Sequence, residues 1–194
     1  MKAEIKKKKL SGLVEIIPEV YEDERGFLAR SYEKKAFQKL GLNIGWKEQS
    51  LHHTNKKYTL RGLYIQLPPY SEGKLLSVIN GEMLWVSVDL RKNSKTFGQW
   101  DSLVLTGALH NLLYAPRGLA HGCVSLSDDV DLLITSDNEF AAAHGVGILW
   151  SDKDLDIDWN LGTNTPFVSA RDGAYPSFQN FKENIHRNHK TRIV

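Results

Sequence analysis

Cysteine is almost absent from this chain. Cys123 is the single cysteine among 194 residues, which excludes a disulfide framework and a cysteine-rich zinc site. Long hydrophobic runs are missing as well. No apolar stretch approaches the ~18 residues that a membrane-spanning helix needs, and no signal-like apolar segment follows the N-terminal lysines. We therefore expect a soluble protein of the cytoplasm with no membrane partner.

Charge of one sign is also scarce, since the formal net charge is +2. The basic excess lies at the ends, because residues 1–9 and 182–194 hold nine of the 25 basic residues and two of the 23 acidic ones. The remaining 16 basic and 21 acidic residues give the body a formal charge of −5. Nucleic-acid binders usually carry a basic face, so we expect no nucleic-acid partner and interpret both ends as solvated tails.

The composition predicts one globular domain. Hydrophobic residues make up 41% and charged residues 25% of the chain, and these proportions are typical of a protein that buries its own core. The hydrophobic pattern fades after Phe181. We therefore expect a single domain over residues 1–181 and a basic C-terminal tail over residues 182–194.

Short strand-like runs fill this domain. The run at residues 75–79 ends at Asn80-Gly81, a dipeptide typical of a hairpin. Residues 83–90 alternate, with Leu84 and Val86 on one face and Trp85 on the other. One helix is predicted, over residues 34–40, with Gly41 at its C-terminal end. Many strands with few short helices predict an all-β fold, an antiparallel jelly roll.

Polar residues interrupt four of the strand-like segments: residues 48–55, 61–66, 74 and 116–122. Period-two spacing puts Gln49 and His53 on one face of the first segment. On the second it puts Tyr64 on the face opposite Arg61. Each segment alone is compatible with an ordinary solvent-facing strand. Together they favour a pocket, because a small barrel keeps polar residues inside when it holds a ligand.

Several short motifs follow one another in order along residues 15–180. They include Asp23-Glu24-Arg25-Gly26-Phe27, Gln49, Leu60-Arg61-Gly62-Leu63, Gln66, Lys74-Leu75, Val88-Asp89-Leu90-Arg91, Ala120-His121-Gly122 and the 169–172 element. In this order and spacing, the set resembles the dTDP-4-dehydrorhamnose 3,5-epimerases, a branch of the cupins. The resemblance implies a cupin-like jelly roll and a homodimer in which partner residues complete each pocket. It also implies a role in bacterial surface polysaccharide (lipopolysaccharide O-antigen) assembly.

The resemblance further implies a substrate and a chemistry. The substrate would be a 4-keto-6-deoxyhexose on a nucleoside diphosphate, with dTDP, CDP and GDP all open, and no cofactor is expected. The 4-keto group acidifies the hydrogens on C3 and C5. A base removes one of them, an enolate forms, and an acid returns a proton on the other face. This chemistry needs a base, an acid and a cation near the enolate oxygen.

Roles follow from the same resemblance. The implied catalytic residues are Lys74 at the enolate, Asp172 as the carboxylate that orients the base, and His121 as a supporting pocket residue. The implied substrate-binding residues are Arg25 and Arg61 on the diphosphate, Phe27 on the nucleotide base across the dimer, and Gln49 and Gln66 on the base or sugar.

Two positions depart from the family pattern. Tyr64 stands where the family has its catalytic histidine, and Phe140 stands where it has its tyrosine acid. Phenylalanine cannot donate a proton, so Phe140 is left as a substrate-contacting residue. Tyrosine, with an ordinary pKa of about 10, is a poor base near neutral pH. We therefore expect epimerisation at C3, at C5 or at both, and favour a single carbon.

His53 is a candidate for the missing base, because an imidazole has an ordinary pKa of about 6.5. We hypothesise that His53 is the base and Tyr64 the acid. The alternative is that His52 or His53 only lines the pocket. Two other functions stay open: a 3,4-ketoisomerase of the cupin type, and a catalytically altered or inactive relative that binds a nucleotide sugar.

A metal site is not expected. Pro116-x-Gly118-x-x-His121 resembles the second metal motif of metal-binding cupins, but the first motif, His-x-His followed by Glu, is missing. His52 and His53 are adjacent, so on a strand they point to opposite faces and cannot share one ion.

Overall fold

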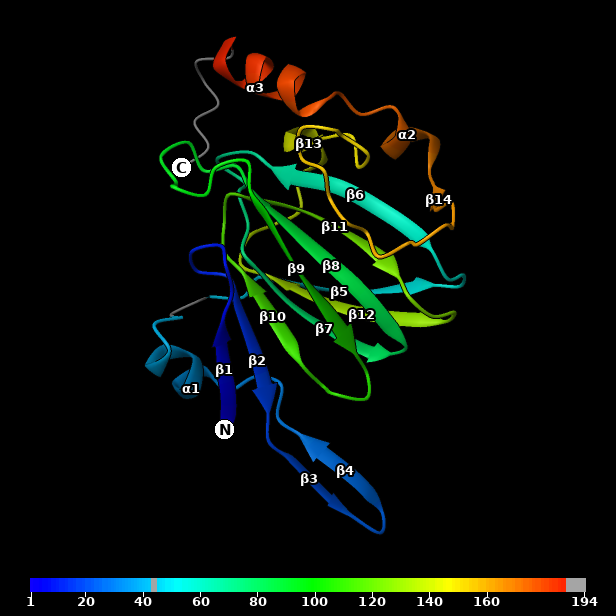
Figure 1. Cartoon of the computed structure of the whole chain (residues 1–194). Coiled ribbons are helices and arrows are strands. Elements are labelled where there is room, and N and C mark those ends of the chain that lie inside the picture. The colour runs from blue at the N-terminus through cyan, green and yellow to red at the C-terminus, as the bar shows by residue number, and fades with distance from the viewer. Residues whose placement is uncertain (43–44, 188–194) are drawn as a thin grey trace.

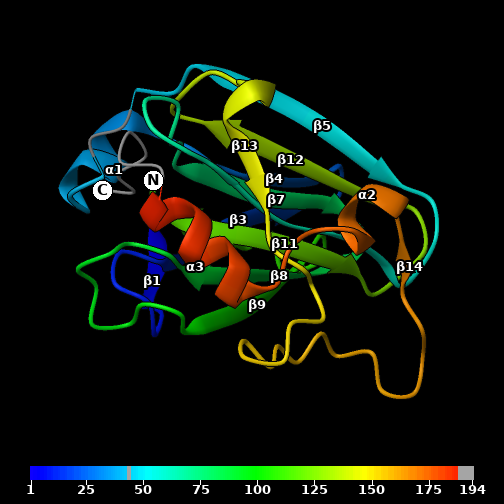
Figure 2. The same ribbon diagram turned by 90° about the horizontal axis from the view of Figure 1, so that it is seen from above.

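Two facing β-sheets form the body of the protein (Figures 1 and 2). The computed structural model describes residues 1–42 and 45–187. Sheet I has the order β1-β2-β10-β7-β12-β5, and sheet II has the order β13-β6-β11-β8-β9 with β14 parallel to β6. The strands are β1 (Ala3–Lys7), β2 (Val14–Pro18), β3 (Val20–Asp23), β4 (Gly26–Ala29), β5 (Glu48–Thr54), β6 (Thr59–Gln66), β7 (Lys74–Asn80), β8 (Glu82–Asp89), β9 (Trp100–Thr106), β10 (Leu112–Ala115), β11 (Leu119–Ser125), β12 (Val130–Ser136), β13 (Gly145–Gly147) and β14 (Phe167–Val168). The predicted all-β antiparallel fold is confirmed.

The alternation predicted for residues 83–90 is also confirmed, and both of its faces are buried. Met83 and Trp85 of β8 pack into the core between the two sheets. Leu84, Val86 and Val88 pack into a second core on the outer face of sheet II, which includes residues of the C-terminal segment. Strand β8 is therefore buried on both faces and lies near the centre of the molecule.

The Asn80-Gly81 turn is present, but the predicted hairpin is wrong. Strand β7 belongs to sheet I and β8 to sheet II, so the chain crosses between sheets at this turn. Gly81 has φ +78°, and a Cβ there would lie 2.7 Å from the Ser127 hydroxyl. The turn therefore requires glycine, but a local turn signal does not decide which sheet the next strand joins.

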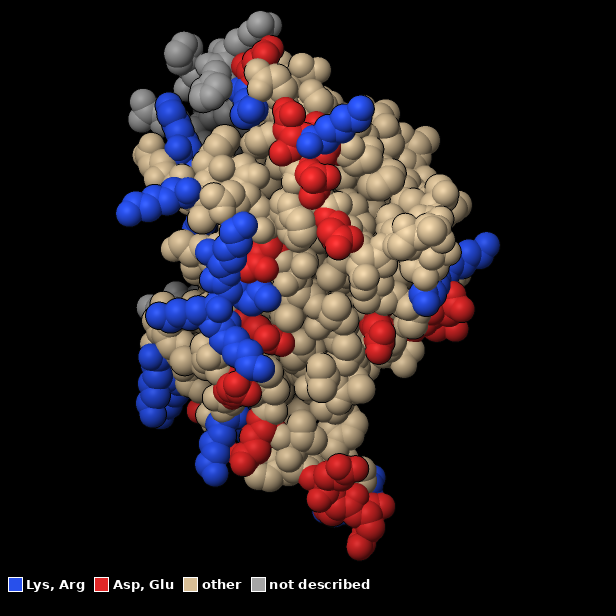
Figure 3. All heavy atoms as spheres, viewed as in Figure 1, with Lys and Arg blue, Asp and Glu red and all other residues tan. Residues whose placement is uncertain are grey.

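The N-terminal segment differs from the prediction. Residues 3–7 are not a solvated tail, because they form edge strand β1, paired along its whole length with β2. Its lysines suit an edge, where charge discourages pairing with another chain. Lysines and arginines gather on this side of the molecule, and acidic side chains gather at the tip of hairpin β3–β4 (Figure 3).

At the other end, helix α3 (Phe178–Arg187) continues past the expected domain boundary at residue 181. Phe178 and Phe181 are buried against sheet II. The rest of the predicted tail, residues 188–194, lies outside the described residues.

The predicted helix is observed as α1 (Lys34–Lys39). Gly41 follows it with φ +78°, and the Leu42 amide donates to the Phe37 carbonyl at 2.9 Å, which satisfies the helix end. Phe37 packs with Leu75 and Tyr114 on the outer face of sheet I. Within the described ranges, no helix is long and apolar enough to cross a membrane.

Candidate active site

A β-bulge in β6 decides which of its polar side chains face the interior between the two sheets. Tyr64 pairs with His121 of β11, but Arg61, three residues earlier, pairs with Cys123, only two residues later. Gly62 occupies the bulge with φ +111°, and a Cβ there would lie 2.7 Å from the Gly122 Cα. Because of this extra residue, Arg61 and Tyr64 both face the interior. Simple alternation placed them on opposite faces, and the bulge overturns that prediction.

Tyr64 is joined to Asp172. Asp172 lies in the short helix α2 (Ala170–Gly173), where its amide donates to the Ser169 hydroxyl at 3.1 Å. Its carboxylate is 2% exposed and accepts from the Tyr64 hydroxyl at 2.5 Å and from the Gly62 amide at 3.3 Å. Arg171, a residue that the sequence did not single out, donates to the Tyr64 hydroxyl at 3.4 Å.

This environment keeps the Tyr64 phenol protonated. Burial, and then the Asp172 carboxylate, raise the pKa of Tyr64 well above its ordinary value of 10.0. The phenol therefore stays protonated at neutral pH and cannot serve as a base.

Lys74 provides a buried cation in the same interior. The residue is 8% exposed, and its ammonium lies 2.7 Å from the Glu72 carboxylate and donates to the Ser136 hydroxyl at 3.4 Å. Strand register puts Lys74 opposite Ser136, which in turn faces Glu48 of β5. Sequence reasoning missed Glu72, because its position two residues before Lys74 carries no pattern of its own.

His121 lies close enough to Lys74 to feel its charge. Burial, and then the Lys74 charge, hold the pKa of His121 well below its ordinary 6.5, so the imidazole is neutral. Its ring stacks on Trp85 with centroids 5.4 Å apart and planes at 25°.

The two neighbouring histidines of β5 face opposite sides of sheet I. His52 pairs with Leu132, which is buried between the sheets, whereas His53 pairs with Asp131. Cross-strand partners share a face, so His52 faces the interior. His53 lies on the outer face, where its Nδ1 is 2.7 Å from Asp131 and its Nε2 is 3.8 Å from Asp129. The structure does not bring His53 together with Lys74.

Gln49 lies on the same outer face as His53, and its amide donates to the Thr135 hydroxyl at 2.9 Å. Gln66 is 5% exposed, and its side-chain amide is hydrogen-bonded to the backbone. It donates to the carbonyls of residues 70 and 139, at 3.0 and 3.1 Å, and accepts from the amide of residue 141 at 2.6 Å. Gln66 therefore anchors the segment that carries Phe140. Phe140 itself is 72% exposed, and its amide donates to the Glu48 carboxylate.

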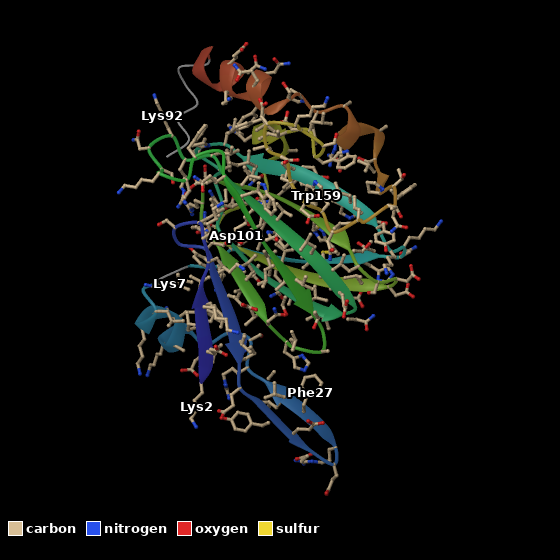
Figure 4. The ribbon with its side chains drawn as sticks, in the orientation of Figure 1. Lys2, Lys7, Phe27, Lys92, Asp101 and Trp159 are labelled. Carbon is tan, nitrogen blue, oxygen red and sulfur yellow. The ribbon has the colours of Figure 1, made fainter. Side chains whose placement is uncertain are left out.

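Arg25 and Phe27 lie outside the body, on hairpin β3–β4 (Figure 4). The Arg25 guanidinium pairs with Asp23 at 2.6 Å, and Phe27 stacks on His110 with centroids 4.2 Å apart. Figure 1 places the hairpin at the end of the molecule away from α2, which carries Asp172.

The interior thus combines a phenol that donates, a buried ammonium and neutral imidazoles. Such groups can stabilise negative charge on a carbonyl oxygen and return a proton to carbon. Across the part of the chain that the structure describes, no three His, Cys, Asp or Glu side chains are grouped to hold a metal ion.

Comparisons with known proteins agree with this geometry. A dTDP-4-dehydrorhamnose 3,5-epimerase of Shigella flexneri is 38% identical over 156 residues, which are 80% of this chain and 84% of that protein. The crystal structure of the Bacillus anthracis enzyme with TDP and PPi bound has a TM-score of 0.87 at 32% identity, covering 91% of this chain and 100% of that one.

The Legionella pneumophila enzyme in complex with dTDP-4-keto-L-rhamnose has a TM-score of 0.86 at 32% identity, covering 92% of this chain and 94% of that one. Residues 7–180 match the sequence profile of dTDP-4-dehydrorhamnose 3,5-epimerase. The chain therefore belongs to the dTDP-4-dehydrorhamnose 3,5-epimerase family of isomerases, with the jelly-roll fold that this family has.

Proposed function

We propose that this protein epimerises a nucleoside-diphosphate-linked 4-keto-6-deoxyhexose at a single carbon, C3 or C5. The observation that carries the proposal is the buried Lys74 ammonium inside the same barrel as the Tyr64–Asp172 pair. A buried cation stabilises the oxygen of an enolate far better than a solvated one does. The relatives with TDP and with dTDP-4-keto-L-rhamnose bound favour dTDP as the nucleotide.

The restriction of epimerisation to one carbon follows from Tyr64 and Phe140, the two departures from the family pattern. Tyr64 is held protonated and donates to Asp172, so it supplies a proton rather than taking one. Phe140 has no proton to give. A pocket with one proton donor and one base can serve one reacting carbon, and we expect it to act on one C–H bond.

We propose that the protein works as a homodimer in which hairpin β3–β4 completes the partner's pocket. Among the described strands, β3 and β4 pair with each other and with no other strand, and a two-stranded hairpin is marginally stable alone. Tyr21, Phe27 and Leu28 are each more than half exposed on it. Leu51 and Ile79, exposed by 64% and 57%, add apolar surface on the outer face of sheet I. A second copy would cover both surfaces and bring Arg25 to a bound diphosphate.

Proton NMR in deuterated water tests the activity. 4-Keto-6-deoxyglucose linked to dTDP, CDP or GDP is incubated with the protein, and the C3 and C5 signals are followed. We expect one of the two signals to disappear with one nucleotide. A bound sugar that exchanges no hydrogen would instead favour the inactive, binding relative. Transfer of the keto group to C3 would favour a 3,4-ketoisomerase.

Sedimentation equilibrium tests the dimer. Wild-type protein should sediment as a dimer, and Phe27→Ser/Leu28→Ser should shift it towards monomer and weaken nucleotide binding. Glu22→Gln changes the same hairpin without removing apolar surface and serves as the matched control. A fully active monomer would contradict the shared pocket.

A further inference from the structure

The proposed reaction needs a base, and most interior groups are already engaged. Among the described residues, Asp172 accepts from Tyr64, Glu72 pairs with Lys74, and the Glu48 carboxylate accepts from a backbone amide. His121 is covered by Trp85, and burial weakens it as a base.

His52 is different. Its Nε2 has one near neighbour in β5, the Ser50 hydroxyl at 3.2 Å. The residue is partly covered and keeps an exposed part, and strand register turns it towards the interior, so a sugar entering the barrel can reach it. These properties suit a group that must meet a substrate and take up a proton.

We propose that His52 is the general base of the single-carbon epimerisation. This inference rests on the function proposed above and names the residue that begins it. His52 belongs to β5 of sheet I, and Tyr64 belongs to β6 of sheet II. A sugar between the facing sheets would therefore present one face of its reacting carbon to the imidazole and the other to the phenol.

The proton balance is simple. The C–H bond breaks, its proton goes to the His52 imidazole, and its electron pair forms the enolate, whose oxygen carries the charge beside Lys74. A new C–H bond forms on the other face with the proton of the Tyr64 hydroxyl. Arg171, 3.4 Å from that oxygen, stabilises the phenolate left behind. Solvent then returns a proton to Tyr64 and takes one from His52, which restores the enzyme.

The surroundings of His52 support this role. Arg61 of β6 and Lys74 of β7 act on it as cations, β12 contributes the apolar Leu132, and Ser50 lies beside it on its own strand. Burial, followed by Arg61 and Lys74, lowers the pKa of His52 below 6.5. The imidazole is therefore neutral at pH 7, and the two cations favour release of the proton that it gains.

The two neighbouring histidines provide a matched experiment. His52→Asn and His53→Asn make the same chemical change on opposite faces of one strand. We expect His52→Asn to slow hydrogen exchange and turnover by about 10²–10⁴-fold with nucleotide affinity unchanged. His53→Asn should stay within about threefold of wild type. Thermal melts of both variants check folding, and His52→Gln replaces His52→Asn if that variant unfolds.

A pH profile separates a base from a packing residue. Wild-type kcat should fall as the pH decreases through the lowered pKa of His52, and free imidazole should partly restore a His52→Ala variant. Folded His52 variants that keep full exchange would overturn the proposal, as would a loss confined to His53→Asn. If wild-type protein exchanges no hydrogen from any of the three nucleotide sugars, the proposed function itself fails, which is a distinct result.

Discussion

Replacing Gly62 by alanine tests whether the β6 bulge is as tight as the structure indicates. A residue other than glycine at φ +111° costs about 1–3 kcal/mol in backbone strain. The added methyl would also lie 2.7 Å from the Gly122 Cα and 2.8 Å from the His121 carbonyl oxygen. Both neighbours are backbone and cannot rotate away, so overpacking adds about 1–3 kcal/mol. We expect Gly62→Ala to lose about 2–6 kcal/mol of unfolding free energy.

Gly26→Ala is the matched control, since Gly26 has φ +128° and nothing within 4 Å of an added Cβ. It should carry only the strain, about 1–3 kcal/mol. Urea unfolding at one fixed protein concentration measures both variants. Equal losses for the two would refute the argument, because they would mean that β6 and β11 do not approach closely at the bulge. Any folded Gly62→Ala should also turn over slowly, since the bulge aims Arg61 and Tyr64 inward.

Three further predictions concern the pocket and the fold around it. By the resemblance, Tyr64→His/Phe140→Tyr would return both proton carriers of the family pattern, so NMR in deuterated water should show exchange at C3 and C5; exchange still limited to one carbon would contradict this. Lys74→Met leaves the buried Glu72 carboxylate unpaired, at a cost of about 3–5 kcal/mol. Glu72→Gln/Lys74→Met should be more stable than Lys74→Met in urea unfolding but should not regain turnover. Recovered turnover would mean that Lys74 has no catalytic role. Burial would raise the pKa of Asp89, but hydrogen bonds from its neighbours outweigh burial and lower it from 3.8 to about 2. Because this pKa is lowered on folding, the carboxylate adds about 2 kcal/mol of stability above pH 4, and this stability is lost as the pH falls towards 2. Asp89→Asn should therefore lose less unfolding free energy than wild type between pH 4 and pH 2. An unchanged pH dependence would refute the assignment.

The fold was predictable where burial imposes a period on the sequence. Strand β8 alternates because two different cores cover its two faces. The lysine-rich β1 misled the prediction, because its apolar face consists of Ala3 and Ile5 alone and the strand is otherwise held by backbone pairing with β2. A strand whose side chains are mostly charged looks like a tail in the sequence and becomes visible only through its partner.

The residue types of the candidate site were predictable from the sequence, but which side chains face the interior was not. In β5, the inward-facing residues Ser50 and His52 are polar, whereas the apolar Leu51 faces outward and is 64% exposed. The prediction chose His53 because it shares a face with Gln49, which the resemblance puts in the pocket, but the structure places both on the outer face. Alternation shows that the two histidines differ in facing, and only the register against β12 shows which one faces the interior.

The two departures that the resemblance implies, at Tyr64 and Phe140, are best understood as one rearrangement. Asp172 is kept, but a carboxylate that orients an imidazole as a base holds a phenol as a donor. In the proposed mechanism, a tyrosine at position 64 therefore reverses the direction in which sheet II passes a proton to the sugar. Once Tyr64 of sheet II donates the proton, the reaction needs no second proton donor at residue 140. Phenylalanine is therefore compatible with activity at that position. The base must then come from sheet I, where His52 faces the interior and feels the charges of Arg61 and Lys74. By this argument His52 and Tyr64 form a pair, and losing either one should stop inversion at the same carbon.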